Sequence, residues 1–238
     1  PGEVDAKLFV RQCQSLKSSF VVPPLDRSGR LLARGELPAR AASITFDDGY
    51  ADNHDVALPI LQRHGLSATF FIATGFLDGG RMWNDTVIEA VRRCRAPALD
   101  LARTELAGLG PLALGDDGQR RAAAEGIIRA IKYRPPVERQ ALVDAVADTA
   151  AADLPTGLMM RSDQVHALHR AGMQIGPHTR SHPILARLDR AAAIDEVAGS
   201  REQLEAITGA PMPVFAYPNG KPGEDYSAET VAIVRELG

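Results

Sequence analysis

Short apolar runs rich in β-branched and aromatic residues alternate along the chain with longer stretches of helical periodicity. The expected strands are residues 41–46, 68–74, 173–176 and 213–217. The expected helices are residues 5–20, 53–64, 84–93, 116–152 (with a break at the Pro135–Pro136 pair), 162–171, 189–208 and 227–237. Between the first helix and the first strand, the Pro23–Pro24 pair and the Ser28–Gly29 pair predict a break in regular structure. Strands that alternate with helices indicate βαβ units, so the sequence predicts an α/β fold with a mainly parallel sheet.

Composition and charge exclude several classes of protein. The 238 residues are 45% hydrophobic and 24% charged, which is typical of a globular protein with a sizeable core. The 27 Lys and Arg residues against 30 Asp and Glu residues give a net charge of −3, which argues against a dedicated nucleic-acid binder. No apolar run approaches the roughly 20 residues that a membrane-spanning helix needs. Only Cys13 and Cys94 could form a disulfide, so a disulfide framework is not expected.

Polar clusters follow three of the expected strands. Residues 47–50 come after the first strand, residues 177–179 after the third and residues 218–220 after the fourth. In parallel α/β folds, ligands bind at the carboxyl ends of the strands. Agreement between three separate strand ends is a stronger indication of a functional site than any single motif.

Asp47 and Asp48 are adjacent carboxylates that directly follow an apolar strand. Their mutual repulsion and partial desolvation are unfavourable unless a cation or a shared proton relieves them. The alternative is an ordinary turn, since Asp-Asp-Gly is good turn chemistry, and the pair alone leaves both interpretations open.

His178 and His182 are four residues apart, which lets two imidazoles converge on one metal ion in a helix or a tight turn. The alternative is two unrelated surface histidines. Taken with the aspartates, the pair offers two imidazoles and one carboxylate, which is the ligand set of a catalytic rather than a structural metal site. The second aspartate is then free to act as a general base.

Four segments carry a resemblance to a known family: TFDDGY (45–50), FFI (70–72), HTRSH (178–182) and FAYPNG (215–220). Together they resemble the polysaccharide deacetylase family, also called the NodB-homology domain or carbohydrate esterase family 4. The resemblance implies a distorted, incomplete (β/α) barrel and a single catalytic domain over residues 1–238, with a helical insertion at about 84–155. It also implies removal of N-acetyl or O-acetyl groups from a sugar polymer, most plausibly one of N-acetylhexosamine. The implied cofactor is a divalent metal, usually Zn²⁺, with Co²⁺, Ni²⁺, Mn²⁺ or Fe²⁺ as alternatives.

The resemblance also implies roles for individual residues. By position, Asp47 matches the general base, and Asp48, His178 and His182 match the metal ligands. The residues expected to line the substrate cleft, to orient its loops or to stabilise the oxyanion are Tyr50, Thr179, Tyr217, Pro218, Asn219 and Trp83. For Trp83, stacking on a sugar ring and plain packing are equally open.

The chain departs from the family pattern in three places. Ala216 stands where the family often has an arginine that orients the base, and no histidine follows His182 to protonate the leaving group. The strand expected before the first helix is also missing. From these departures we expect a chain cut short at both ends, one that binds metal but has little deacetylase activity.

Two other functions stay open on the sequence. One is a small-molecule amidase on the same scaffold, and the other is a carbohydrate-binding relic without activity, as the substituted Ala216 would suggest. The expected partner is an acetylated carbohydrate and not a nucleic acid, no transmembrane segment is expected, and the oligomeric state is left open. The location is also left open between the bacterial cytoplasm and the cell envelope, because no leader sequence is visible.

Overall fold

The computed structural model describes residues 4–238 and divides into two compact units. The first unit combines the described residues up to Gly80 with Gly157–Gly238, and the second is Arg81–Thr156. The second unit covers nearly the same residues as the expected helical insertion. Whether the chain acts as a single catalytic domain stays a prediction.

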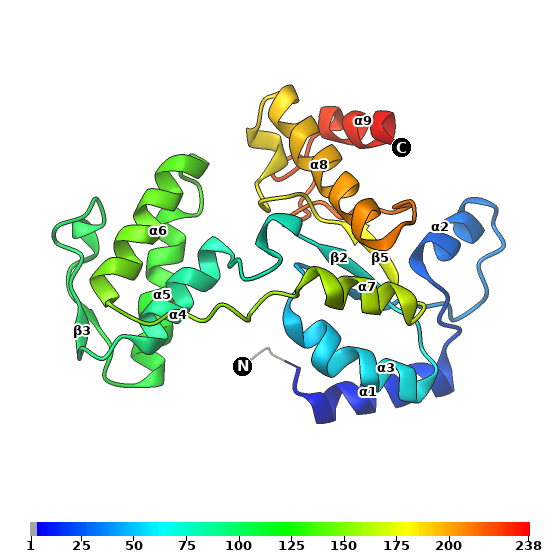
Figure 1. Cartoon of the computed structure of the whole chain (residues 1–238), viewed down its shortest axis with the longest axis horizontal. Helices are drawn as coiled ribbons and strands as arrows, with labels where there is room; N and C mark the ends of the chain where they lie inside the picture. The colour runs from blue at the N-terminus through cyan, green and yellow to red at the C-terminus, as the bar shows by residue number, and fades with distance from the viewer. Residues whose placement is uncertain (1–3) are drawn as a thin grey trace. The chain divides into compact units, whose positions relative to one another are not determined.

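The first unit is built on a parallel sheet of three strands, in the order β1 (Thr45–Phe46), β2 (Thr69–Ile72) and β5 (Gln174–Pro177) (Figure 1). All four residues of β2 are buried, as expected of the central strand of a parallel sheet. The predicted parallel α/β architecture is therefore confirmed. Within residues 4–238 the strands do not close into a barrel.

The α-helices of the first unit begin and end at local sequence signals. In chain order they are α1 (Ala6–Ser19), α2 (Leu25–Ala33), α3 (Leu58–His64), α7 (Ser162–Arg170), α8 (Arg190–Thr208) and α9 (Ala228–Leu237). Asp5, Asp189 and Ser227 each accept a hydrogen bond from a backbone N–H in the first turn of the following helix. Gly65 and Gly209 end α3 and α8 in the left-handed conformation, at φ of 63° and 69°. α1 and α3 lie side by side, and α7 and α8 pack on β5 (Figure 1).

The predicted strand 41–46 is wrong in its first half, since only Thr45–Phe46 pairs with β2. The backbone N–H of Ala42 instead donates to the Val21 carbonyl, and the Ser43 hydroxyl donates to the Pro23 carbonyl. Residues 41–43 are therefore held by the segment after α1 rather than by the sheet.

The predicted strand 213–217 is also wrong, because this segment has no strand geometry. It does run beside β5: the Ala216 N–H donates to the Pro177 carbonyl at 3.2 Å. Pro177 has no N–H to return, and Pro213 removes a further donor, so a regular ladder cannot form.

Two helical predictions also need correction. The Pro-Pro and Ser-Gly pairs predict a break here, but residues 25–33 form the helix α2. Pro24 directly precedes its first turn, where a backbone N–H would have no partner within the helix, so the lack of one in proline does not weaken the helix. The expected helix 53–64 begins as a π-helical segment, η1 (Asn53–Ala57), before it continues as α3. Pro59 cannot donate the next α-helical hydrogen bond, which accounts for the irregular start.

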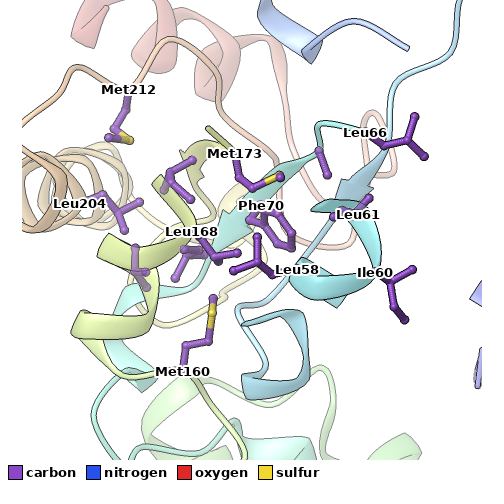
Figure 2. Packing of buried hydrophobic residues seen from close by; sticks show 14 of the residues in the cluster. Leu58, Ile60, Leu61, Leu66, Phe70, Met160, Leu168, Met173, Leu204 and Met212 are labelled. Carbon is purple, nitrogen blue, oxygen red and sulfur yellow. The ribbon is translucent and has the colours of Figure 1, made fainter. Parts of the chain in front are cut away.

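The core of the first unit lies between the sheet and its helices. Figure 2 shows Phe70 of β2 with Leu58, Leu168 and Met173 around it, and all four are buried. Leu61 of α3 belongs to the same cluster and has no exposed surface. Burial of these side chains is the main term that stabilises the unit.

Leu61→Ala should lower the free energy of unfolding by about 2–5 kcal/mol, because it removes buried methyl groups and leaves a cavity. Urea titration followed by far-UV circular dichroism measures the change. Leu32→Ala is the matched control, since Leu32 is 66% exposed and its loss should change the free energy by no more than about 0.5 kcal/mol. Equal effects of the two substitutions would contradict this description of the core.

The second unit consists of three α-helices, a short 3-10 helix and a short antiparallel pair of strands. Its elements are α4 (Trp83–Arg93), β3 (Ala98–Leu99), η3 (Ala107–Leu109), β4 (Leu112–Ala113), α5 (Asp117–Ile131) and α6 (Pro136–Ala150) (Figure 1). α4 packs on both α5 and α6, around Val87, Ile127 and Val143. The Arg120 guanidinium donates to the carbonyls of Val91, Arg92 and Cys94 and so satisfies the end of α4.

No helix in the described part of the chain combines the length and apolar character needed to span a membrane.

Candidate metal centre

Asp48 lies in the turn that directly follows β1. Its backbone is in the left-handed region at φ 74°, and Gly49 follows at φ 91°. A Cβ at Gly49 would lie 3.0 Å from the Cγ2 atom of Ile72, so glycine suits this close approach as well as the backbone angle. The Gly49 carbonyl accepts from the Met160 N–H, and the Asp48 carbonyl accepts from the Ala73 N–H. The turn is thus held from two sides.

His178 follows β5, and its side chain is only 5% exposed. Its backbone N–H donates to the Ile72 carbonyl, which continues the ladder between β2 and β5. The Nδ1 atom lies 2.8 Å from the carbonyl oxygen of Ala216. A carbonyl only accepts hydrogen bonds, so Nδ1 carries a proton and Nε2 is the ring nitrogen that can serve as a metal ligand.

His182 is reached through a tight loop rather than a helix. Thr179 and His182 both have positive φ, at 65° and 54°. The Thr179 hydroxyl donates to the His178 carbonyl at 2.5 Å and accepts from the His182 N–H at 3.1 Å. This short loop brings the two imidazoles to a centroid distance of 4.9 Å.

The structure brings Asp48, His178 and His182 together at one point. One ligand atom from each lies within 4.8 Å of the others. The Oδ1 atom of Asp48 is 3.5 Å from Nε2 of His178 and 3.4 Å from Nε2 of His182. Two donors on one tetrahedral zinc ion at about 2.0–2.1 Å lie about 3.4 Å apart, so these separations fit such an ion.

The two aspartates have opposite pKa shifts. Desolvation acts to raise the pKa of Asp48, but the hydrogen bond to His178 and the charges of His182 and His178 outweigh it and hold that pKa below its ordinary value. For Asp47, desolvation dominates and raises the pKa; His178 opposes this effect and the neighbouring Asp48 adds to it. The two carboxylates therefore differ in environment although they are adjacent in sequence.

The other residues predicted for the site lie at different depths around it. Tyr50 pairs with Met159 in an isolated antiparallel bridge, and Pro218 is buried. Asn219 is exposed and has φ 62°. The Tyr217 ring stacks on Tyr226 at 4.3 Å.

Trp83 is the predicted site residue that belongs to the second unit. The Arg139 guanidinium lies over its indole ring, 4.8 Å from the centroid, and the ring packs against the core of that unit. Arg139 itself is buried, and burial lowers the pKa of its guanidinium. Sugar stacking by Trp83 stays a prediction.

Strained backbone is concentrated among the residues predicted for the candidate metal centre. Seven non-glycine residues in the described chain have positive φ: Arg40, Asp48, Asp78, Ala151, Thr179, His182 and Asn219. Four of the seven are residues predicted for the site. Such conformations are unfavourable for residues with a Cβ and persist where the surroundings fix them, which is typical of functional sites.

Two sets of residues that support the site are not apparent from the sequence. The backbone N–H groups of Thr74 and Gly75, after β2, donate to the carbonyls of Thr179 and Arg180. Glu196 of α8 accepts from the loop between the two histidines. No sequence motif surrounds Glu196. In the sequence it resembles any charged residue on an exposed helix face, and only its contacts with the loop show a different role.

Comparison with known proteins agrees with this geometry. A sequence model described as "Polysaccharide deacetylase" matches residues 34–101 and 138–238. The chain is 42% identical over 43 residues to the "Putative polysaccharide deacetylase YxkH" of Bacillus subtilis (strain 168). That match covers 18% of this chain and 15% of the relative, well under two thirds of the relative's length.

Two solved structures share the fold at low sequence identity. The Streptococcus pyogenes deacetylase PplD, in complex with acetate, is 19% identical with a TM-score of 0.60, covering 98% of this chain and 70% of its own. The de-N-acetylase from Aggregatibacter actinomycetemcomitans is 15% identical with a TM-score of 0.56, covering 98% and 74%. These similarities confirm the predicted type of α/β fold, with an open rather than a closed sheet. Because the family match spans well over half of its residues, the chain belongs to the polysaccharide deacetylase family.

Proposed function

We propose that the chain is a metal-dependent hydrolase that removes acetyl groups from a carbohydrate, with an N-acetylhexosamine polymer as its substrate. Family membership supports the reaction class. The observation that carries the proposal is the convergence of Asp48, His178 and His182, with Asp47 on the same turn. Among the structural neighbours, one is named as a de-N-acetylase, which favours an acetamide over an acetate ester.

The three converging side chains are proposed to hold the metal. Two imidazoles and one carboxylate suit Zn²⁺, and the same set accepts Co²⁺, Ni²⁺, Mn²⁺ or Fe²⁺. A divalent ion bound there would supply Lewis-acid polarisation of water and of the acetyl carbonyl. The hydrogen bond from His178 to the Ala216 carbonyl orients the imidazole for this role, as outer partners of metal-binding histidines commonly do. This contribution of residue 216 is made by the backbone and does not need an arginine side chain.

Asp47 is proposed as the proton acceptor. Asp47 keeps access to solvent although its carboxylate is partly desolvated, and it is next to Asp48 in sequence but outside the converging set. Its carboxylate oxygen can take a proton from an attacking water molecule, the role of a general base. The Asp48 carboxylate lies against the two histidines, so Asp48 is proposed as a metal ligand and Asp47 as the general base.

The segment after β5 is proposed to stabilise the oxyanion that forms on the acetyl group. Ala216 is held by two hydrogen bonds: its N–H donates to the Pro177 carbonyl, and its carbonyl accepts from Nδ1 of His178. In the described chain the next backbone N–H, that of Tyr217, donates to no other residue, so it remains available to a substrate oxygen. The proton for the leaving amine has no assigned donor, since no histidine follows His182.

An acetate-release assay on a panel of acetylated glycans tests the proposal. We expect release from N-acetylhexosamine oligomers, loss of release with a chelator, and recovery when Zn²⁺ or Co²⁺ is added back. Release from small amides but not from glycans would instead support the amidase alternative. Glycan binding without metal binding or acetate release would support the binding relic.

A further inference from the structure

The loop that joins the two histidines has an unfavourable backbone and so depends on external support. Thr179 has φ 65°, which is unusual for a β-branched residue, and His182 has φ 54°. Conformations of this kind persist only where surrounding contacts fix them. The position of the His182 imidazole relative to His178 is set by whatever supplies those contacts.

On one side, the loop is held through its carbonyl groups. The Thr179 carbonyl accepts from the Thr74 N–H at 3.1 Å, and the Arg180 carbonyl accepts from the Gly75 N–H at 2.8 Å. A Cβ at Gly75 would lie 2.7 Å from the Arg180 oxygen, so the two backbones are as close as a glycine allows. These contacts fix the loop to the segment after β2 and leave its N–H groups for another partner.

On the other side, the loop is held through those N–H groups by a single side chain. The backbone N–H groups of Arg180 and Ser181 both donate to Oε2 of Glu196, each at 2.8 Å. The Ser181 hydroxyl donates to the other carboxylate oxygen at 2.5 Å. Glu196 is on the 19-residue helix α8, which packs on β5 and gives the carboxylate a rigid base.

We infer that Glu196 is a positioning residue that sets metal affinity by fixing the loop between His178 and His182. The inference rests on the proposed metal centre. Ser181 directly precedes His182, and the Nε2 atom of His182 lies 3.4 Å from Oδ1 of Asp48. Without the carboxylate, the loop can rotate about its carbonyl contacts and move that imidazole away from the other two ligand groups. The printed hydrogen bonds of Glu196 go to the loop between the ligands, through the N–H groups of Arg180 and Ser181 and the Ser181 hydroxyl.

Asp195 provides a matched control on the same helix. It is also a carboxylate that interacts with the loop, but with the Arg180 guanidinium, at 3.1 Å, and its side chain is 70% exposed. A solvent-exposed pair of this kind contributes little. Loss of Asp195 removes one negative charge near the loop and leaves all three Glu196 hydrogen bonds in place.

The test measures Zn²⁺ and Co²⁺ affinity of the full chain by competition with a chelating dye, together with the Co²⁺ d–d absorption spectrum. Glu196→Ala should weaken binding by about 10- to 100-fold and change the spectrum, as loss of an outer partner does at other metal sites. Asp195→Ala should stay within about 2-fold of the parent and keep its spectrum. Thermal unfolding without metal checks that each variant is folded.

Two further variants separate the effect of the length of the Glu196 side chain from the effect of its charge. They also allow the inference to be tested if Glu196→Ala does not fold. Glu196→Gln keeps an oxygen that accepts both N–H groups, so it should retain affinity within about 3-fold although the charge is gone. Glu196→Asp keeps the charge but is shorter by one methylene, so it should weaken binding by about 10-fold. Parental affinity and spectrum in Glu196→Asp, or in Glu196→Ala where that variant folds, would overturn the inference. Failure of the parent chain itself to bind either ion would instead overturn the metal centre, and the inference with it.

Discussion

Asp47→Asn should lower the rate of acetate release by about 10²- to 10⁴-fold, the usual contribution of a general base. The amide has nearly the same size as the carboxylate but cannot accept the proton. Metal affinity should stay close to that of the parent, because Asp47 lies outside the three converging ligand groups. The measurements are initial rates of acetate release and metal content after dialysis, on the same preparation.

Asp163→Asn is the control for the general effect of removing a carboxylate. Asp163 is 68% exposed, and its partner Arg161 is equally at the surface, so release and metal content should both be unchanged. If Asp47→Asn lost metal to the same extent as a ligand variant, the roles of the two aspartates would have to be exchanged. Full activity of Asp47→Asn would remove Asp47 from the mechanism altogether.

The convergence of the candidate ligands could be predicted from the sequence because it depends on chain topology. Parallel strands have their carboxyl ends at one edge of the sheet, so polar residues that directly follow β1 and β5 must come close together. This argument places Asp48 near His178 without any knowledge of side-chain conformation. It also tolerates an error in strand length, since β1 has only two residues and yet ends where the prediction requires.

The contacts that hold the site could not be predicted in the same way. The positive φ of Thr179 and His182 is unfavourable for both residue types, so local propensity argues against the observed loop. Glu196 is on a helix whose sequence pattern describes a solvated face, and its role arises only once α8 packs on β5. The loss of the predicted strand at 213–217 has a similar origin, because Pro177 on the neighbouring strand removes the donor that a ladder needs.

His178→Ala is expected to have the largest effect on metal binding. It deletes one of three ligand groups, so affinity for Zn²⁺ should fall by more than about 100-fold, the upper end of the loss produced by outer partners alone. Acetate release should fall to the background of the assay. Competition with a chelating dye gives the affinity, and metal content after gel filtration gives an independent check.

The substitution also disturbs the fold locally, and this effect must be separated from ligand loss. His178 is buried, and its removal leaves the Ala216 carbonyl without its partner, which costs about 1–3 kcal/mol of stability. His166→Ala is the matched control. His166 of α7 makes the same kind of hydrogen bond, from Nδ1 to the Ile207 carbonyl at 2.9 Å, but at an exposed position. It should leave metal affinity unchanged.

Free imidazole provides the decisive comparison for His178→Ala. Truncation to alanine leaves space the size of the lost ring between the Ala216 carbonyl and Oδ1 of Asp48, and imidazole can donate to the former while presenting a nitrogen toward the latter. Added imidazole should therefore restore part of the metal affinity in His178→Ala and have no such effect in His166→Ala. Parental affinity in His178→Ala without imidazole would remove this residue from the ligand set. Asp48 and His182 alone would then be too few protein ligands for a catalytic zinc site.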